Sequence, residues 1–249
     1  MTTKHRIGSA ALVAAFLALA TAGQARADFL INNGGFEAGF ASWTRQNQAG
    51  SEGTFVIQTG TSSPVNGDPV PAPPGGLSAA MTDAQGPGSH VLYQDFVVPV
   101  LVINSAVLKF DLFIGNRGTA FVTPAAATLD FSTPALNQQA RVDILRAGTD
   151  PFSVAAADIL QNVYQTRVGD PLVSGYTTTT VDLTALLAAN VGRTLRLRFA
   201  ETDNVFTFQL GVDNVSLTAV PEPSSVVLFG TGALLGLAGI RRRNRRAAR

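Results

Sequence analysis

The sequence predicts an all-β fold in which two antiparallel sheets pack face to face. Between residues 28 and 218, patterns that alternate apolar and polar side chains outnumber helical patterns. The alternation leaves one face of each strand apolar, which is typical of antiparallel sheets that share a core. About eight such strands fit a two-sheet sandwich. The chain contains no cysteine, which excludes disulfides and thiolate metal sites.

The two clearest strands lie at 106–114 and 193–199. On one face the first carries Leu108, Phe110, Leu112 and Ile114, and on the other Lys109 and Asp111. The second is expected to point Leu195, Leu197 and Phe199 inward, and Arg196 and Arg198 outward. These faces predict the main layers of the core.

Further strands are predicted at 54–58, 90–98, 139–146, 176–183, 205–210 and 212–218. At 205–210 the pattern places Phe206, Phe208 and Leu210 on one side. Gly211 then predicts a β-bulge.

Two short helices are predicted at 152–163 and 184–189. Residues 60–76 contain five prolines and are expected to be irregular. Residues 116–137 form a second long loop, and long loops on a rigid sandwich often bind ligands. No internal repeat and no second domain are predicted.

The formal net charge of +1 hides a segregated distribution. Residues 28–218 contain nine basic and sixteen acidic side chains, a balance of −7. The other nine basic side chains lie at the two ends of the chain, three before Asp28 and six after Ile240. Nucleic-acid binding needs a basic surface, so the acidic middle segment argues against that class of partner.

Residues 1–27 have the parts of a secretory signal peptide. A basic start at 4–6 precedes an apolar stretch at 7–22. Ala25 and Ala27 then supply the small residues that signal peptidase accepts, so cleavage is expected after Ala27. An uncleaved N-terminal anchor is the alternative.

The chain closes with an apolar run at 226–240 and an arginine cluster that begins with Arg241, Arg242 and Arg243. A helix over this run would be about 22 Å long, which spans a bilayer core of about 30 Å only marginally. The arginines act as a membrane stop and are expected to stay in the cytoplasm. Residues 28–220 would then lie on the exported side.

Pro221, Glu222 and Pro223 precede this run, and the whole segment 219–249 resembles the PEP-CTERM sorting signal of Gram-negative bacteria. The resemblance implies cleavage near this motif by an exosortase, a membrane enzyme similar to transpeptidases. It also implies transient membrane anchoring, then a place at the cell surface or in an exopolysaccharide biofilm matrix. The prolines favour an extended backbone, the form that a protease binds.

Segment 32–39, Asn-Asn-Gly-Gly-Phe-Glu-Ala-Gly, resembles the opening of carbohydrate-binding jelly rolls with the galactose-binding-like fold. Segment 211–217, Gly-Val-Asp-Asn-Val-Ser-Leu, is similar to their last strand. The resemblance implies one jelly-roll domain over 28–218. It also implies a structural calcium held by Glu37 and Asp213, since Ca²⁺ prefers oxygen ligands. Alternatively, Glu37 caps a turn and Asp213 is a surface residue.

A sugar site in such a domain usually combines an aromatic ring with hydrogen-bonding groups. The candidate rings are Trp43, Tyr93, Phe121, Phe131, Tyr164 and Tyr176. Trp43 follows the opening motif and is expected to pack in the core. Loop aromatics are the better candidates.

No catalytic site is predicted. His90 is the only histidine between 28 and 218, and its neighbour Ser89 would point to the opposite face of the strand. His90 is therefore expected to be a structural or surface residue. The sequence predicts a non-enzymatic exported protein that contacts polysaccharide. The alternatives are a purely structural or adhesive matrix protein, and a polysaccharide hydrolase.

Overall fold

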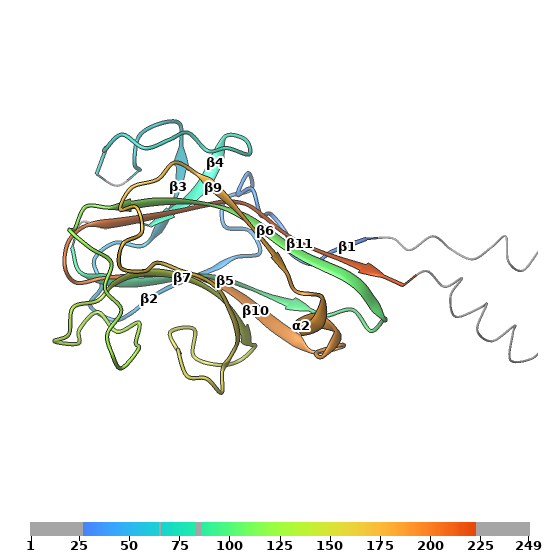
Figure 1. The fold of residues 1–249 in the computed structure, drawn as a ribbon. Helices are drawn as coiled ribbons and strands as arrows, with labels where there is room; N and C mark the ends of the chain where they lie inside the picture. The colour runs from blue at the N-terminus through green and yellow to red at the C-terminus, as the bar shows by residue number, and fades with distance from the viewer. Residues whose placement is uncertain (1–26, 65, 83–85, 223–249) are drawn as a thin grey trace, which may run out of the picture.

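The computed structural model describes residues 27–64, 66–82 and 86–222 and confirms an all-β sandwich of two antiparallel sheets (Figure 1). The first sheet has the order β3 (Phe55–Thr59), β4 (Ser78–Thr82), β11 (Phe208–Pro221), β6 (Ile103–Asn116) and β9 (Thr177–Asp182), and β1 (Asp28–Phe29) also pairs with β11. The second has the order β2 (Thr44–Asn47), β5 (Gly88–Val97), β10 (Thr194–Asp203), β7 (Gln138–Arg146) and β8 (Ile159–Gln165). One short helix, α2 (Thr184–Ala188), follows β9.

The core forms where the two sheets face each other, and it uses the predicted apolar faces. From β6 it takes Leu108, Phe110, Leu112 and Ile114, and from β10 Leu195, Leu197 and Phe199. The rings of Phe110 and Phe199 meet edge to face across the sheets, with 5.4 Å between centroids. Each such buried side chain stabilises the fold by about 1.5–3 kcal/mol.

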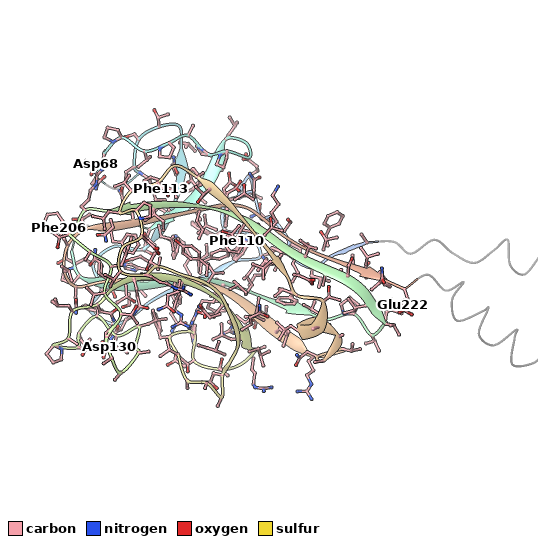
Figure 2. The ribbon with its side chains drawn as sticks, in the orientation of Figure 1. Asp68, Phe110, Phe113, Asp130, Phe206 and Glu222 are labelled. Carbon is pink, nitrogen blue, oxygen red and sulfur yellow. The ribbon has the colours of Figure 1, made fainter. Side chains whose placement is uncertain are left out.

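The sandwich has two distinct ends (Figure 1). The terminal end carries α2, the start of β1 and the end of β11. The opposite, loop end carries the turn 204–207 between β10 and β11 and the loop 117–137 between β6 and β7. Figure 2 shows Glu222 at the terminal end, and Phe206 and Asp130 at the loop end.

The predicted helix at 152–163 is wrong, because β8 occupies its second half as an edge strand on β7. Register shifts between Val142 and Asp143, and between Ile144 and Leu145, interrupt the pairing. These irregularities break the two-residue alternation that would have marked a strand. The other predicted helix is confirmed, since α2 lies within 184–189.

The predicted bulge at Gly211 is also wrong. Gly211 pairs regularly with Phe113 and with Met81, and the register shift in β11 comes later, between Asp213 and Ser216. Asn214 has a φ of 51° there, a conformation that asparagine tolerates better than most residues. Glycine is needed at 211 for close packing, because an added Cβ would lie 2.6 Å from the Tyr176 hydroxyl oxygen.

Replacing Gly211 with alanine should therefore destabilise the sandwich. The new Cβ would also lie 2.9 Å from the Cβ of Phe113, and overpacking of this kind costs about 1–3 kcal/mol. Gly175→Ala is the matched control, because no atom lies within 4 Å of its added Cβ. Urea unfolding would compare the two variants, and equal midpoints would contradict the packing role of Gly211.

Several predicted features lie outside the described residues. They are the signal peptide up to residue 26, including Ala25, and the sorting signal from Pro223 onward, including the predicted membrane helix and Arg241, Arg242 and Arg243. In the part of the chain that is described, no helix is long and apolar enough to cross a membrane. Pro221 is the last residue of β11 and is extended, as predicted.

Candidate functional site

The turn 204–207 exposes an aromatic side chain at the loop end. Phe206 is 60% exposed, although the sequence pattern placed it inward with Phe208 and Leu210. Only Phe208 and Leu210 reach the core. The prediction failed because β10 and β11 belong to different sheets, so the chain crosses between sheets here and the alternation restarts.

The buried side chain of Gln138, the first residue of β7, holds the backbone of this turn by hydrogen bonds. Its side-chain Oε1 accepts hydrogen bonds from the backbone N–H groups of Val205 and Phe206, at 3.3 and 3.4 Å. Its Nε2 donates to the Phe206 carbonyl at 2.6 Å and to Asn116 Oδ1 at 2.9 Å. Gln138 is fully buried. Both backbone polar groups of Phe206 are therefore fixed by one rigid side chain.

Asn204 ties the turn to the long loop 117–137. Its Nδ2 donates to the carbonyl groups of Phe131, Thr133 and Ala135, and its Oδ1 accepts the N–H of Asn137 at 2.7 Å. The loop and the turn thus form one preorganised surface. The sequence contained a signal for this turn, since Asp-Asn pairs favour turns, but nothing in it pointed to Gln138.

An open hollow of roughly 430 Å³ lies beside the exposed ring. Its lining consists of Gly86, Pro87, Asp203, Asn204, Val205, Phe206 and Thr207. Asp203 is buried, and its Oδ1 accepts the N–H of Gly88 at 2.9 Å. An exposed aromatic ring with polar groups beside it can stack on the apolar face of a sugar, and less conformational entropy is lost on binding when the backbone of its turn is already held.

The predicted calcium ligands Glu37 and Asp213 meet the same short segment. Glu37 Oε1 accepts the N–H groups of Leu77 and Ser78 at 2.8 and 3.0 Å. Asp213 Oδ2 accepts the N–H of Gly75 at 3.0 Å. The structure therefore brings the opening and closing motifs together around residues 75–78. Glu37 is exposed, whereas Asp213 is buried rather than a surface residue.

Burial raises the pKa of Asp213 to about 6, and the nearby negative charges of Asp111 and Glu37 add to this effect. None of the ion pairs between described residues involves these three carboxylates. A hard cation would relieve their repulsion, so the donor chemistry suits calcium. The described residues contain no preformed cluster of three metal-binding side chains. Backbone carbonyls or water would have to complete the coordination.

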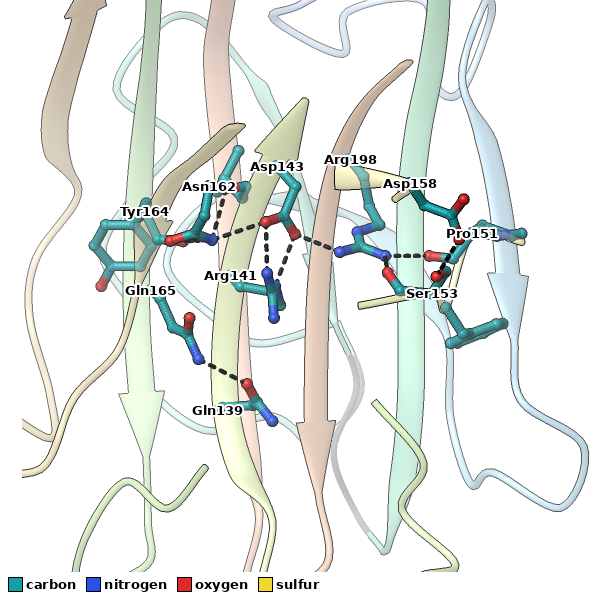
Figure 3. Close-up of polar contacts among 12 residues, drawn as sticks. Gln139, Arg141, Asp143, Pro151, Ser153, Asp158, Asn162, Tyr164, Gln165 and Arg198 are labelled. Carbon is teal, nitrogen blue, oxygen red and sulfur yellow. Dashed lines mark hydrogen bonds and ion pairs between the residues drawn. The ribbon is translucent and has the colours of Figure 1, made fainter. Parts of the chain in front are cut away.

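A buried charge network lies on the outer face of the second sheet (Figure 3). Asp143 Oδ1 accepts hydrogen bonds from Arg141 Nη2 and Asn162 Nδ2, at 2.7 and 2.8 Å. Asp143 Oδ2 accepts from Arg141 Nε at 2.8 Å and from Arg198. Burial alone would raise the pKa of Asp143, but the two guanidinium groups outweigh it, so the pKa lies below its usual value.

Arg198 links this network to the loop between β7 and β8. Its Nη1 donates to the carbonyl groups of Pro151 and Ser153, at 2.6 and 2.7 Å (Figure 3). Arg196 and Arg198 point outward as predicted, yet both are buried because this loop covers them. The network is therefore structural, since it fastens the loop onto the sheet.

The other candidate aromatics offer no better platform. Trp43 is buried as predicted, where it packs on Phe36 and Phe199. Phe121 is 1% exposed, which corrects its interpretation as an open loop aromatic. The partly buried rings are Tyr93, Phe131, Tyr164 and Tyr176. The Arg196 guanidinium covers Tyr93, with its carbon 3.9 Å from the ring centroid.

His90 is a buried residue of the second sheet. Its Nδ1 lies 2.9 Å from Asn47 Oδ1, and burial lowers its pKa to about 4. Ser89 instead donates to Thr202 Oγ1 at 3.1 Å. The two neighbours therefore have separate partners, as expected for adjacent strand residues.

Residues 219–245 match the family of the PEP-CTERM protein-sorting motif, which confirms the resemblance of the C-terminal segment. The match concerns the sorting of the chain rather than its activity. Comparison with curated protein sequences finds no match.

The fold is similar to several solved structures. A cleaved adhesin domain of Lys-gingipain from Porphyromonas gingivalis is 14% identical, with a TM-score of 0.48 over 78% of this chain and 99% of that one. TmCBM61, solved with β-1,4-galactotriose, is 10% identical, with a TM-score of 0.43 over 76% and 97%. The Stig cyclase Fisc from Fischerella sp. TAU is 21% identical, with a TM-score of 0.44 over 79% and 99%. At such low identities and scores, the likenesses identify neither a ligand nor an activity.

Proposed function

We propose that the chain, which carries a PEP-CTERM protein-sorting motif, is a non-enzymatic exported protein of the Gram-negative cell surface or biofilm matrix. In this proposal signal peptidase cuts after Ala27, and an exosortase processes the chain near Pro221, Glu222 and Pro223. The folded domain then contacts extracellular polysaccharide. The sorting motif supports export to the cell surface. The exposed aromatic side chain at the loop end supports the contact with polysaccharide.

The single observation that carries the polysaccharide contact is the exposed ring of Phe206 on a turn whose backbone is held by hydrogen bonds. Gln138 and Asn204 hold the backbone of the turn that carries the ring, and the hollow lies beside it. Phe206 also lies at the end of the sandwich opposite Glu222, which belongs to the sorting segment (Figure 2). A chain tethered at the terminal end would therefore present Phe206 away from the membrane.

Binding to a panel of extracellular polysaccharides, including the exopolysaccharide of the host, tests this proposal. Retention of the protein on at least one immobilised polymer is the expected result. Failure to bind every polymer would contradict it. If deletion of the gene still changed cell aggregation, the result would favour a purely structural or adhesive matrix protein.

A polysaccharide hydrolase is the less favoured alternative. Glu201 and Asp203 lie two residues apart on β10, and Asp203 lines the hollow. However, Asp203 is buried and accepts the N–H of Gly88, so it is poorly placed to act on a polymer. Release of reducing ends from a bound polysaccharide, lost in Asp203→Asn, would overturn the non-enzymatic assignment.

We also propose that Glu37 and Asp213 hold a structural calcium ion. At a concentration a hundred times its Kd, the ion would stabilise the fold by about 2.7 kcal/mol. Thermal unfolding with calcium and with chelator measures the effect. Glu37→Ala and Asp213→Ala should each abolish the difference. An unchanged melting temperature of the original protein after chelation would contradict the site.

The calcium effect should depend on pH. The folded pKa of Asp213, about 6, lies above its ordinary value of 3.8, so without calcium its protonation favours the folded state as pH falls below 6. Calcium needs the ionised carboxylate, so its stabilisation should be full at pH 7 and fade as pH falls through 6. A calcium-dependent melting shift of equal size at pH 7 and pH 5 would exclude Asp213 as a ligand.

A further inference from the structure

An exposed apolar surface lies at the terminal end of the sandwich. This terminal patch consists of Val100, Leu101, Val102, Ala188 and Val191. Val100, Leu101 and Val102 are 77%, 53% and 62% exposed, although all three are large aliphatic side chains. Contiguous exposed apolar surface of this kind marks a site of interaction with a protein or a membrane.

The terminal patch is a fixed surface rather than a loose loop. The N–H of Val98 donates to the Arg193 carbonyl at 2.9 Å, and the N–H of Gly192 donates to the Val98 carbonyl at 3.0 Å. These bonds join the connection between β5 and β6 to the segment that follows α2. Their side chains line one hollow, from Val100–Ile103 on one side and from Ala188 and Val191 on the other.

The sorting segment leaves the domain from this patch. Pro221 pairs with Ile103, and the N–H of Glu222 donates to the Val102 carbonyl at 2.8 Å. The apolar run begins at Val226, only four residues after Glu222. An extended chain covers at most about 14 Å over four residues. Insertion of this run into a bilayer would therefore bring the patch close to the lipid.

The apolar run at 226–240 is too short to hold the domain away from the membrane. Its fifteen residues are shorter than a bilayer core of about 30 Å requires, and a short span draws its flanking residues toward the interface. The signal segment, predicted to end at Ala27, would leave beside β1 at the same end. Phe29 in β1 is 74% exposed there, and Arg193 is also exposed beside Val191. Aromatic and cationic side chains favour the membrane interface.

We propose that the terminal patch rests on the exported surface of the lipid bilayer while segment 226–240 is inserted. The branched aliphatic side chains would enter the boundary between headgroups and acyl chains, and the sandwich would stand on the membrane with its loop end outward. This inference depends on the sorting motif and is independent of sugar binding.

Full-length protein in vesicles of phosphatidylcholine and phosphatidylglycerol provides the test. Because the chain has no cysteine, Leu101→Cys introduces one site for an environment-sensitive fluorophore. Leu136→Cys is the matched control, since Leu136 is similarly exposed, at 59%, and lies in the long loop of the loop end. Both substitutions are at exposed positions, so neither should disturb folding.

Spin-labelled acyl chains should quench the fluorophore at position 101 severalfold more than at position 136. Equal quenching at the two positions would overturn the proposal. A fluorophore at 101 that is shielded from aqueous iodide but not quenched by lipid would also overturn it. If dilution of the protein then removed the shielding from iodide, a second copy of the chain would be the group that covers the patch. If the shielding persisted on dilution, the chain's own C-terminal segment would cover it.

Discussion

Substitution of Asp143 by alanine is expected to cause one of the largest losses of stability in this protein. The change leaves the guanidinium groups of Arg141 and Arg198 buried together without their shared carboxylate. Removal of one partner from a buried ion pair costs about 3–5 kcal/mol. Denaturant unfolding monitored by circular dichroism measures the loss.

Asp95→Ala is the matched control for this prediction. Asp95 accepts two hydrogen bonds from Arg196 in the same sheet, but its side chain is 39% exposed. Exposed ion pairs contribute about 1 kcal/mol or less. If Asp143→Ala and Asp95→Ala lost equal stability, Asp143 would not be the centre of the buried network. Limited proteolysis should additionally show faster cleavage within 147–158 in the Asp143 variant than in the Asp95 variant, because Arg198, which donates to the Pro151 and Ser153 carbonyl groups, would lose the carboxylate that positions it.

The second large effect is expected at Gly34, where the opening motif packs on β11. The Gly34 carbonyl accepts the N–H of Val215 at 2.9 Å, and a Cβ added at Gly34 would lie 1.7 Å from the Val215 carbonyl oxygen. The clash is with backbone, so no side-chain rotation relieves it. Gly34→Ala should therefore destabilise the sandwich by about 3 kcal/mol or more, because it must separate the two motifs.

The adjacent glycine supplies the control for Gly34→Ala. A Cβ at Gly35 would have one neighbour within 4 Å, Asp213 Oδ1 at 3.9 Å, which is an ordinary contact. The free energy of unfolding of Gly35→Ala should lie within about 0.5 kcal/mol of that of the original protein. Equal melting of the two variants would show that the opening motif does not pack closely on β11.

Sequence alone predicted the strands that have one buried face. In β6 and β10 the apolar side chains alternate, because one face meets the core. The pattern failed in β4, whose five residues are all buried. Met81 packs with Val70 and Phe113 on the outer face of the first sheet, so both faces of β4 are covered and no alternation results.

The candidate site depended on contacts between residues far apart in the sequence. Gln138 reaches a turn 68 residues later, and Asp143 meets Arg198 across 55 residues. No local pattern encodes such pairs. The resemblance to carbohydrate-binding jelly rolls did place Glu37 and Asp213 together. A family resemblance implies which distant residues lie close in space, whereas the periodicity of a sequence does not. Phe206 was misplaced because a strand pattern cannot show where a chain changes sheets.

At the loop end, the exposed ring of Phe206 is expected to contact polysaccharide. The most direct measurement compares the affinity of Phe206→Ala and Leu136→Ala for the polymer that the original protein binds. Both side chains are exposed, at 60% and 59%, so both variants should keep the original melting temperature. Phe206→Ala should lose about 2 kcal/mol of binding free energy, roughly thirtyfold in Kd, while Leu136→Ala keeps its affinity. Unchanged binding by Phe206→Ala would contradict the claim.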